Sequence, residues 1–228
     1  MIETNLENLL AELPSDVKLV AVSKYHPIQD ILTAYQAGQR RFAESRPQEF
    51  EAKAVQLPQD IEWHFIGHLQ TNKLKMVLPF AYMVQSVDSE RLLSAIDRWA
   101  CGNGRKVRVL LELHVAAEES KQGFTEEEVL DILFRAESYR GIIFCGLMGM
   151  ATNTDDMDTV AADFGRIRAY FDYLKDLFQE LDEFRELSIG MSSDWKTALE
   201  SGSTMVRIGT AIFGERVPVL RPLIQDSI

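Results

Sequence analysis

Short apolar runs rich in β-branched residues alternate with helical patterns along almost the whole chain, and this alternation limits the possible folds more than any other feature. Eight such runs occur, at residues 17–24, 41–45, 62–67, 82–87, 107–115, 142–149, 186–191 and 205–214. Helical patterns occupy residues 28–38, 47–57, 71–78, 89–100, 125–139, 158–179 and 193–201, and a further helix at about 3–13 precedes the first run. This order predicts βαβ units around a parallel sheet.

The number of repeats favours one of two parallel-sheet architectures. An open doubly wound sheet usually has five or six strands, whereas eight β/α repeats in 228 residues fit a closed (β/α)8 TIM barrel. Because no Pro/Ser-rich linker or low-complexity segment divides the chain, we predict a single α/β barrel domain over residues 1–228, with a core at about 17–214 and an extra N-terminal helix.

Active sites of such barrels lie where the strands end, so the strand ends supply the candidate functional residues. The residues selected in this way are Lys24, Glu44, Ser45, Gly67, His68, Met148, Gly149, Met191, Ser192, Gly209 and Thr210.

Charge and composition exclude several classes of function. The chain has 24 basic and 35 acidic residues, a formal net charge of −11, and no dense Lys/Arg run, which argues against nucleic acids and anionic membranes as partners. The N-terminus lacks the features of a secretory signal, and no apolar stretch approaches the length of a membrane span. Cys101 and Cys145 form no metal-binding or disulfide pattern. We therefore expect a cytoplasmic protein without a metal site. We also expect a monomer, although these features do not fix the oligomeric state.

Lys24 ends the first apolar run and is a candidate nucleophile. Partial burial at a barrel mouth lowers the pKa of an ammonium group and leaves more neutral amine, the form that attacks an aldehyde to give a Schiff base. The alternative interpretation is a solvated lysine at the rim, since charged side chains are mostly exposed.

The last two runs end in small residues suited to an anion. Backbone N–H groups of Gly209 and Thr210, with the Thr210 hydroxyl, offer donors for phosphate oxygens, and Ser192 adds a hydroxyl at the neighbouring strand end. Loops after strands 7 and 8 are the usual phosphate site in these barrels. Either segment alone is equally consistent with a tight turn.

Arg207 lies two residues before Gly209 and therefore faces the same side of its strand. A guanidinium there can donate to a pyridine nitrogen and, because it keeps its proton, would leave that nitrogen unprotonated. A salt bridge to Glu44 or Glu112 is the alternative. His64 and His68 straddle a strand end rather than sharing a helix face, so we predict no zinc site and assign both to packing or to the rim.

Several motifs together resemble the pyridoxal phosphate homeostasis protein family. They are Ala-Val-Ser-Lys at 21–24, Trp-His-Phe-Ile-Gly-His-Leu-Gln-Thr-Asn-Lys at 63–73, Ser-Lys-Gln-Gly-Phe at 120–124, Gly-Leu-Met at 146–148, Ser-Ile-Gly-Met-Ser at 188–192 and Gly-Ser-Thr-Met-Val-Arg-Ile-Gly-Thr-Ala-Ile-Phe-Gly at 202–214. The motifs occur in the family order and cover about residues 17–214.

The resemblance implies a barrel of the alanine racemase N-terminal type that binds pyridoxal 5′-phosphate (PLP). Lys24 would hold the cofactor as a Schiff base, Arg207 would meet the pyridine nitrogen, and Ser192, Gly209 and Thr210 would hold the phosphate. The sequence departs from the family pattern at Ser45, where an asparagine is usual, and this puts in doubt any contact which that asparagine makes near the cofactor.

The resemblance also bears on catalysis. Related racemases take a second acid–base group, a tyrosine, from a C-terminal β domain, and only 14 residues follow Gly214 here, so we expect that domain to be missing. We predict a PLP-binding protein of vitamin B6 homeostasis without robust turnover, which supplies PLP to apo-enzymes. The alternatives are a PLP-dependent amino-acid racemase and a Schiff-base aldolase that uses Lys24.

Overall fold

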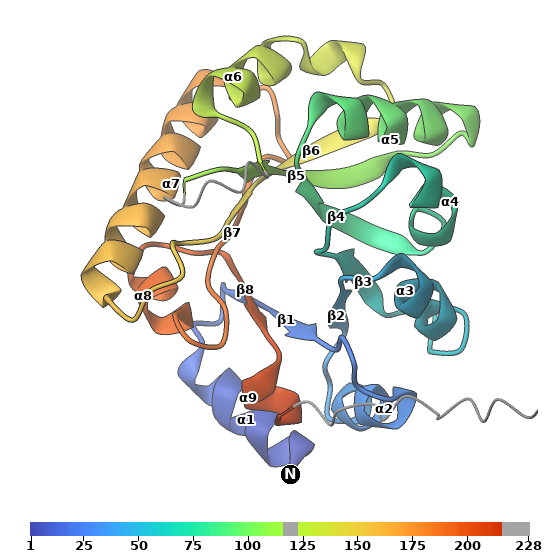
Figure 1. Ribbon diagram of the computed structural model, residues 1–228, viewed down its shortest axis with the longest axis vertical. Coiled ribbons are helices and arrows are strands. Elements are labelled where there is room, and N and C mark those ends of the chain that lie inside the picture. Colours follow the sequence, from blue (N-terminus) through green and yellow to red (C-terminus); the bar gives the residue numbers. More distant parts are fainter. Residues whose placement is uncertain (116–122, 216–228) are drawn as a thin grey trace, which may run out of the picture.

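The structure is a computed structural model that describes residues 1–115 and 123–215. Eight parallel strands follow one another in chain order around a closed barrel, and β8 pairs with β1 to complete it (Figure 1). The strands are β1 (Lys18–Val22), β2 (Arg41–Glu44), β3 (Glu62–Phe65), β4 (Ala81–Val87), β5 (Val107–Leu113), β6 (Ile142–Gly149), β7 (Glu186–Ser188) and β8 (Met205–Ile208). The predicted TIM barrel is confirmed.

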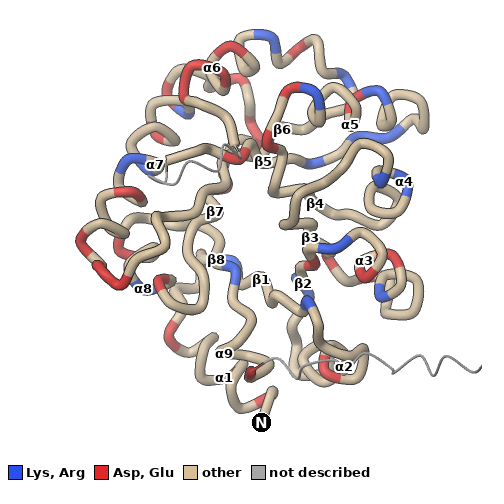
Figure 2. The backbone as a smooth tube through the Cα atoms, viewed as in Figure 1, with Lys and Arg blue, Asp and Glu red and all other residues tan. Residues whose placement is uncertain are grey.

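Helices connect successive strands and surround the barrel (Figure 1). They are α1 (Ile2–Glu12), α2 (Ile28–Gln36), α3 (Pro47–Ala54), α4 (Leu74–Val77), α5 (Glu90–Gly102), α6 (Glu126–Phe134), α7 (Met157–Leu177), α8 (Trp195–Glu200) and α9 (Thr210–Phe213), with 3-10 turns η1 (Thr71–Lys73) and η2 (Ala136–Ser138). The extra N-terminal helix, α1, lies beside α9 (Figure 1). Figure 2 marks positions of Asp and Glu along most of the outer helices, interspersed with positions of Lys and Arg.

Residue alternation along the strands divides the core into two layers. Inside the barrel, Val20, Val22, Ala43, Met83 and Leu110 form one cluster. The residues between them on the same strands face outward and pack under the helices, where they join a much larger cluster of aromatic and aliphatic side chains. Because successive strand residues point to opposite faces, this alternation also determines which polar side chains enter the barrel.

Local chemistry fixes several helix starts. Thr125 and Glu128 form a reciprocal capping box at α6, and the Ser89 side chain accepts from Leu92 N at α5. Pro47 occupies the first turn of α3, where its missing N–H costs no hydrogen bond.

The strand predicted at residues 205–214 is wrong in its second half. β8 ends at Ile208, and the N–H groups of Ile212 and Phe213 both donate to the Gly209 carbonyl at 2.9 Å, which starts the turn of helix α9. Since an apolar run reads alike as strand or buried helix, periodicity could not separate the two. β7 likewise stops at Ser188, before Gly190 turns the chain with a φ of +94°.

The helix predicted at 125–139 ends at Phe134, and a separate 3-10 turn follows it. Part of the motif at 120–124, namely residues 120–122, lies outside the described residues. Within the described ranges, no helix combines the length and the apolar character needed to cross a membrane.

Candidate functional site

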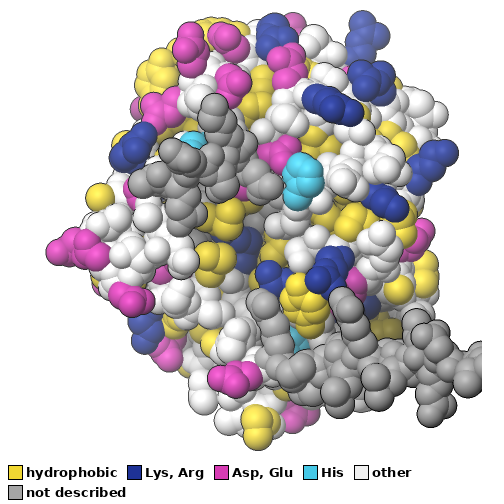
Figure 3. Space-filling view, in the orientation of Figure 1, with side chains coloured by type: hydrophobic (Ala, Val, Ile, Leu, Met, Phe, Trp, Pro, Cys, Tyr) yellow, Lys and Arg dark blue, Asp and Glu magenta, His cyan; other side chains and the backbone are white. Residues whose placement is uncertain are grey.

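The carboxyl ends of the eight strands meet at one mouth of the barrel. Figure 3 views this face and shows a hollow near its centre with Lys and Arg side chains inside it. Because β8 pairs with both β7 and β1, three neighbouring strands carry Lys24, Ser192, Arg207, Gly209 and Thr210: Arg207 lies within β8 and the other four follow the strand ends. The structure thus gathers the five residues predicted from separate parts of the sequence.

Lys24 lies in a tight turn two residues beyond the end of β1 and is partly buried. His26 N donates to the Ser23 carbonyl at 3.0 Å to close the turn. Tyr25 adopts a φ of +70°, which is uncommon for a residue with a side chain, and its N–H donates to Glu49 Oε1 at 2.7 Å. The residues on both sides of Lys24 are therefore held by hydrogen bonds.

A buried ion cluster supports this turn from outside the barrel. Lys53 Nζ, on α3, donates to Glu44 Oε1 at 2.7 Å and to the Ser23 carbonyl at 2.9 Å, and the Ser23 hydroxyl also donates to Glu44 Oε1 at 2.7 Å. Burial raises the pKa of Glu44 to about 7, although Lys53 and Ser23 both lower it. Glu44, a strand-end candidate, thus faces α3 and pairs with Lys53, so the alternative in which it pairs with Arg207 is wrong.

Arg207 is buried inside the barrel and has neutral acceptors. Its Nη1 donates to both the carbonyl and the hydroxyl of Ser188 at 2.7 Å, and its Nη2 donates to the Gly149 carbonyl at 3.0 Å. Ser188 in turn donates to Gln85 Oε1 at 2.7 Å, and Gln85 Nε2 lies 2.8 Å from His64 Nδ1. A polar chain therefore crosses the barrel from β3 to β8 and fixes the guanidinium.

The protonation states along this chain follow from burial. Desolvation lowers the pKa of Arg207 to about 10, opposed by Glu112 and Asp194, so the guanidinium keeps its proton at neutral pH. Desolvation also lowers the pKa of His64 to about 3, so its ring is neutral. Arg207 can therefore donate to a ligand atom but cannot accept from it.

The end of β8 offers small, polar groups at the surface of the mouth. Ser192 and Thr210 are exposed, and Gly209 N donates to Ser192 Oγ at 3.3 Å. A Cβ built on Gly209 would lie 2.9 Å from the Val22 carbonyl, so the glycine lets β8 end close against β1. Hydroxyl and N–H donors of this kind suit a phosphate group.

The two histidines differ in position: His64 is part of the barrel packing and His68 lies at the rim. His64 is fully buried in the barrel, whereas His68 is exposed and its Nδ1 lies 2.8 Å from Asp88 Oδ2. Ser45 follows β2 and packs its backbone against Gly67, since a Cβ on that glycine would lie 2.1 Å from the Ser45 carbonyl. Across the described part of the chain, no group of three or more His, Cys, Asp or Glu residues could hold a metal ion.

A second polar concavity adjoins the mouth. A cavity of about 250 Å³ is lined by residues at and beyond the ends of β5, β6 and β7, among them Glu112, His114, Met150 and Asp194. Burial raises the pKa of Glu112 to about 7, and nearby Asp88 adds to the rise while Arg207 opposes it.

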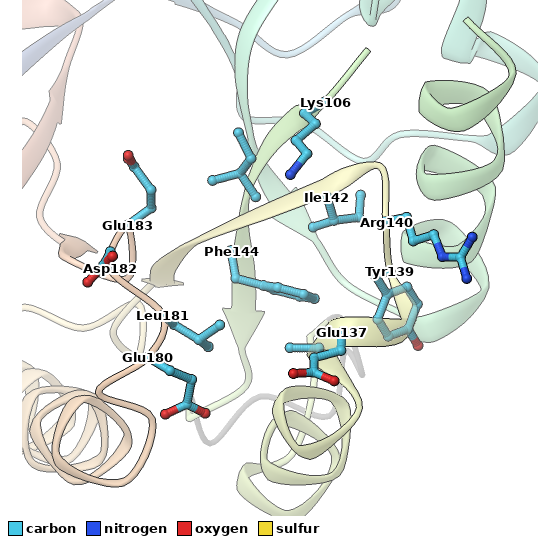
Figure 4. Close-up of a pocket in the computed structure, with 12 residues that line it drawn as sticks. Lys106, Glu137, Tyr139, Arg140, Ile142, Phe144, Glu180, Leu181, Asp182 and Glu183 are labelled. Atoms are coloured by element: carbon cyan, nitrogen blue, oxygen red, sulfur yellow. The ribbon is translucent and has the colours of Figure 1, made fainter. Parts of the chain in front are cut away.

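Another pocket, of about 580 Å³, lies at the opposite end of the barrel (Figure 4). Lys106 precedes β5, Ile142 begins β6, and residues 180–183 precede β7, so this pocket surrounds the strand starts rather than their ends. Figure 4 shows Phe144 between Leu181 and Tyr139 on its wall. It shares no residue with the mouth.

Sequence reasoning missed the residues that hold the predicted ones in place. Gln85 was assigned only to an apolar run, and Ser188 to a run and to the motif at 188–192, although both are polar residues within strands, which is a signal of an interior polar chain. Lys53 could have been found from its spacing of four residues from Glu49 on one helix.

Comparison with known proteins first gives the class. The family model described as "Alanine racemase, N-terminal domain" matches residues 1–217. Alanine racemase from E. faecalis superposes with a TM-score of 0.73 at 19% identity, over 94% of this chain and 57% of that one, a likeness that concerns the fold alone. The chain is thus a barrel of the alanine racemase N-terminal class.

Closer relatives define the family within that class. The pyridoxal phosphate homeostasis protein of Pasteurella multocida is 38% identical over 89% of this chain and 88% of its own length, and the human one is 36% identical over 94% and 84%. PipY of Synechococcus elongatus, solved with PLP bound, superposes with a TM-score of 0.85 at 35% identity, over 94% of this chain and all of that one. The chain belongs to the pyridoxal phosphate homeostasis protein family.

Proposed function

We propose that this chain binds PLP as a Schiff base on Lys24 and acts in intracellular PLP homeostasis and supply. The observation that supports this most directly is the meeting of a partly buried lysine, a buried arginine and a set of hydroxyl and N–H donors on three neighbouring strand ends. Their chemistry matches an aldehyde, a ring nitrogen and a phosphate, and PLP is the molecule bound in the PipY structure.

Arg207 would orient the cofactor ring. Its guanidinium is fixed by Ser188 and Gly149 and keeps its proton, so it would donate to the pyridine nitrogen and leave it unprotonated. PLP supplies its electron sink most effectively when that nitrogen is protonated, so this pairing disfavours steps that place charge on the ring.

Ser192, Gly209 and Thr210 would hold the phosphate. Two hydroxyls and backbone N–H groups supply directed donors without a cation of their own. Gly209 lets the end of β8 lie close to β1, and Lys24 comes two residues after the end of β1. The phosphate would thus be bound locally by a chain whose formal net charge is −11.

We propose a carrier rather than an enzyme, in keeping with the weaker electron sink, and assign no catalytic residue. In this proposal residues 1–228 form one cytoplasmic, monomeric domain that passes PLP to apo-enzymes. Two experiments test it. Borohydride reduction followed by peptide mass spectrometry should locate PLP on Lys24. Amino acids in heavy water should exchange their α-proton no faster with the loaded protein than with free PLP.

Other outcomes would favour the two alternatives. Lys24-dependent exchange of the α-proton of alanine or serine, well above the free-PLP rate, would identify a racemase-like enzyme. Borohydride trapping with a sugar phosphate but without PLP would identify a Schiff-base aldolase. A protein that forms no adduct with PLP at all would refute the proposal.

A further inference from the structure

The ion cluster beneath the Lys24 turn makes more polar contacts than are needed to pack α3 against the barrel. Lys53 is buried and uses its three donors on three acceptors: Glu44 Oε1, Glu49 Oε1 and the Ser23 carbonyl, at 2.7, 2.7 and 2.9 Å. One carboxylate from α3, one from β2 and a backbone carbonyl thus converge on a single ammonium group. Ion pairs as buried as this one contribute little net stability compared with apolar packing, which points to another role.

The cluster's contacts end on the backbone at both sides of Lys24. Lys53 and Glu44 bind the carbonyl and the hydroxyl of Ser23, and Glu49 Oε1 accepts the Tyr25 N–H at 2.7 Å. Lys24 is the residue between these two anchors.

The conformation of the turn needs such anchors. A φ of +70° at Tyr25 is unfavourable for a residue with a side chain, and strained backbone persists only where its surroundings hold it. Further contacts of the turn include the Arg46 guanidinium carbon, 4.6 Å from the centre of the Tyr25 ring, and the ring of Phe213, 4.9 Å from that of His26.

We propose that Glu49 and Lys53 are positioning residues for Lys24: by fixing Ser23 and Tyr25, they aim its amine at the aldehyde of bound PLP. This inference rests on the proposed function and extends it. Neither side chain touches the cofactor in this proposal. The ring and phosphate would be held by β7 and β8, so the cluster would govern only the step in which the amine attacks the aldehyde carbon, water leaves and the Schiff base forms.

The separation between the two sets of contacts makes the proposal testable. Pyridoxine 5′-phosphate carries an alcohol in place of the aldehyde and binds only through the ring and the phosphate. A loss of Lys24 positioning lowers the rate of Schiff-base formation with PLP and leaves binding of pyridoxine 5′-phosphate unchanged. General damage to the fold weakens both.

Glu49 is the residue of choice for substitution, because its side chain is 21% exposed and its loss leaves Lys53 paired with Glu44. Glu49→Ala removes the acceptor of the Tyr25 N–H, whereas Glu49→Gln keeps an oxygen at that place. Glu51→Ala is the matched control, since it removes the same charge from the same helix.

The experiment follows the visible absorbance of full-length protein mixed with PLP, and measures pyridoxine 5′-phosphate affinity by calorimetry. Because a misplacement of about 1 Å can cost roughly 100-fold in rate, we expect at least a tenfold slower Schiff-base formation in Glu49→Ala. Affinity for pyridoxine 5′-phosphate should stay within twofold, and Glu49→Gln and Glu51→Ala should form the Schiff base at close to the wild-type rate.

Three results would overturn the inference. Wild-type rates in Glu49→Ala would show that the anchor does not position Lys24, and equal weakening of both ligands would show a structural role only. A wild-type protein that itself forms no Schiff base would overturn both the proposed function and this inference. The first two results would overturn the inference alone, so the two failures can be told apart.

Discussion

Ser188→Ala is expected to release Arg207 from the polar chain inside the barrel. The Ser188 hydroxyl accepts from Arg207 Nη1 and donates to Gln85 Oε1, both at 2.7 Å, and the residue is fully buried. Alanine removes both hydrogen bonds and leaves the Gln85 oxygen without this donor. Arg207 Nη1 keeps the Ser188 carbonyl as an acceptor, so the guanidinium is loosened rather than left unpaired.

The magnitude follows from the kinds of bond lost. A hydrogen bond to a charged group is worth about 1.5–3 kcal/mol and a neutral one about 0.5–1.5 kcal/mol, so Ser188→Ala should lower the free energy of unfolding by roughly 2–4 kcal/mol. For a chain of 228 residues, each kcal/mol shifts the melting temperature by about 2–4 °C, which gives a decrease of roughly 4–16 °C.

Chemical denaturation of the PLP-free protein measures this difference, with Ser86→Ala as the control. Ser86 is also a buried serine in a strand, but within the described residues its hydroxyl makes a single hydrogen bond, to the Gly67 carbonyl. Its replacement should therefore cost about 1 kcal/mol. If Ser188→Ala lowers the free energy of unfolding no more than Ser86→Ala does, the idea that the polar chain inside the barrel fixes Arg207 is refuted.

Three further predictions concern other parts of the mouth. Gly209→Ala should lower stability by about 1–3 kcal/mol and weaken phosphate binding, because the new Cβ would lie 2.9 Å from the Val22 carbonyl; unchanged melting and unchanged PLP affinity would contradict this. Because burial raises the pKa of Glu112 to about 7, its neutral form stabilises the folded state at low pH. This contribution to the unfolding free energy, up to about 3 kcal/mol, should be lost as pH rises from about 4.5 through 7. The unfolding free energy of Glu112→Gln should therefore fall less over that range. Lys53→Met should cost about 3–5 kcal/mol by leaving the Glu44 carboxylate buried without a cation, and adding Glu44→Gln should restore most of it; a double variant as unstable as the single one would refute the pairing.

The sequence contained enough to predict the barrel and the strand ends. Eight apolar runs in regular alternation with helical patterns allow few other folds, and parallel strands place their carboxyl ends together. Lys24 and Gly209 could be selected on that basis, and Arg207 from its place two residues before Gly209. The structure brings them onto neighbouring strands, as the closure between β8 and β1 requires.

What the sequence did not reveal depends on which side of a strand each residue faces and on contacts between distant segments. Glu44 was grouped with the mouth because it ends β2, but its side chain points outward and meets Lys53. Arg207 takes Ser188 and Gly149 as partners, from β7 and β6, and no local pattern links these positions. The helical turn at Thr210–Phe213 was hidden because a short apolar segment fits either secondary structure.

The visible absorption spectrum of the purified protein with PLP, compared with that of Lys24→Ala, tests the central claim most directly. We expect the wild-type protein to show the absorbance of a protonated imine, and Lys24→Ala, still folded by circular dichroism, to lose it. An imine absorbance of equal strength in Lys24→Ala, or a wild-type protein that stays colourless with added PLP, would contradict the assignment of Lys24 as the residue that holds the cofactor.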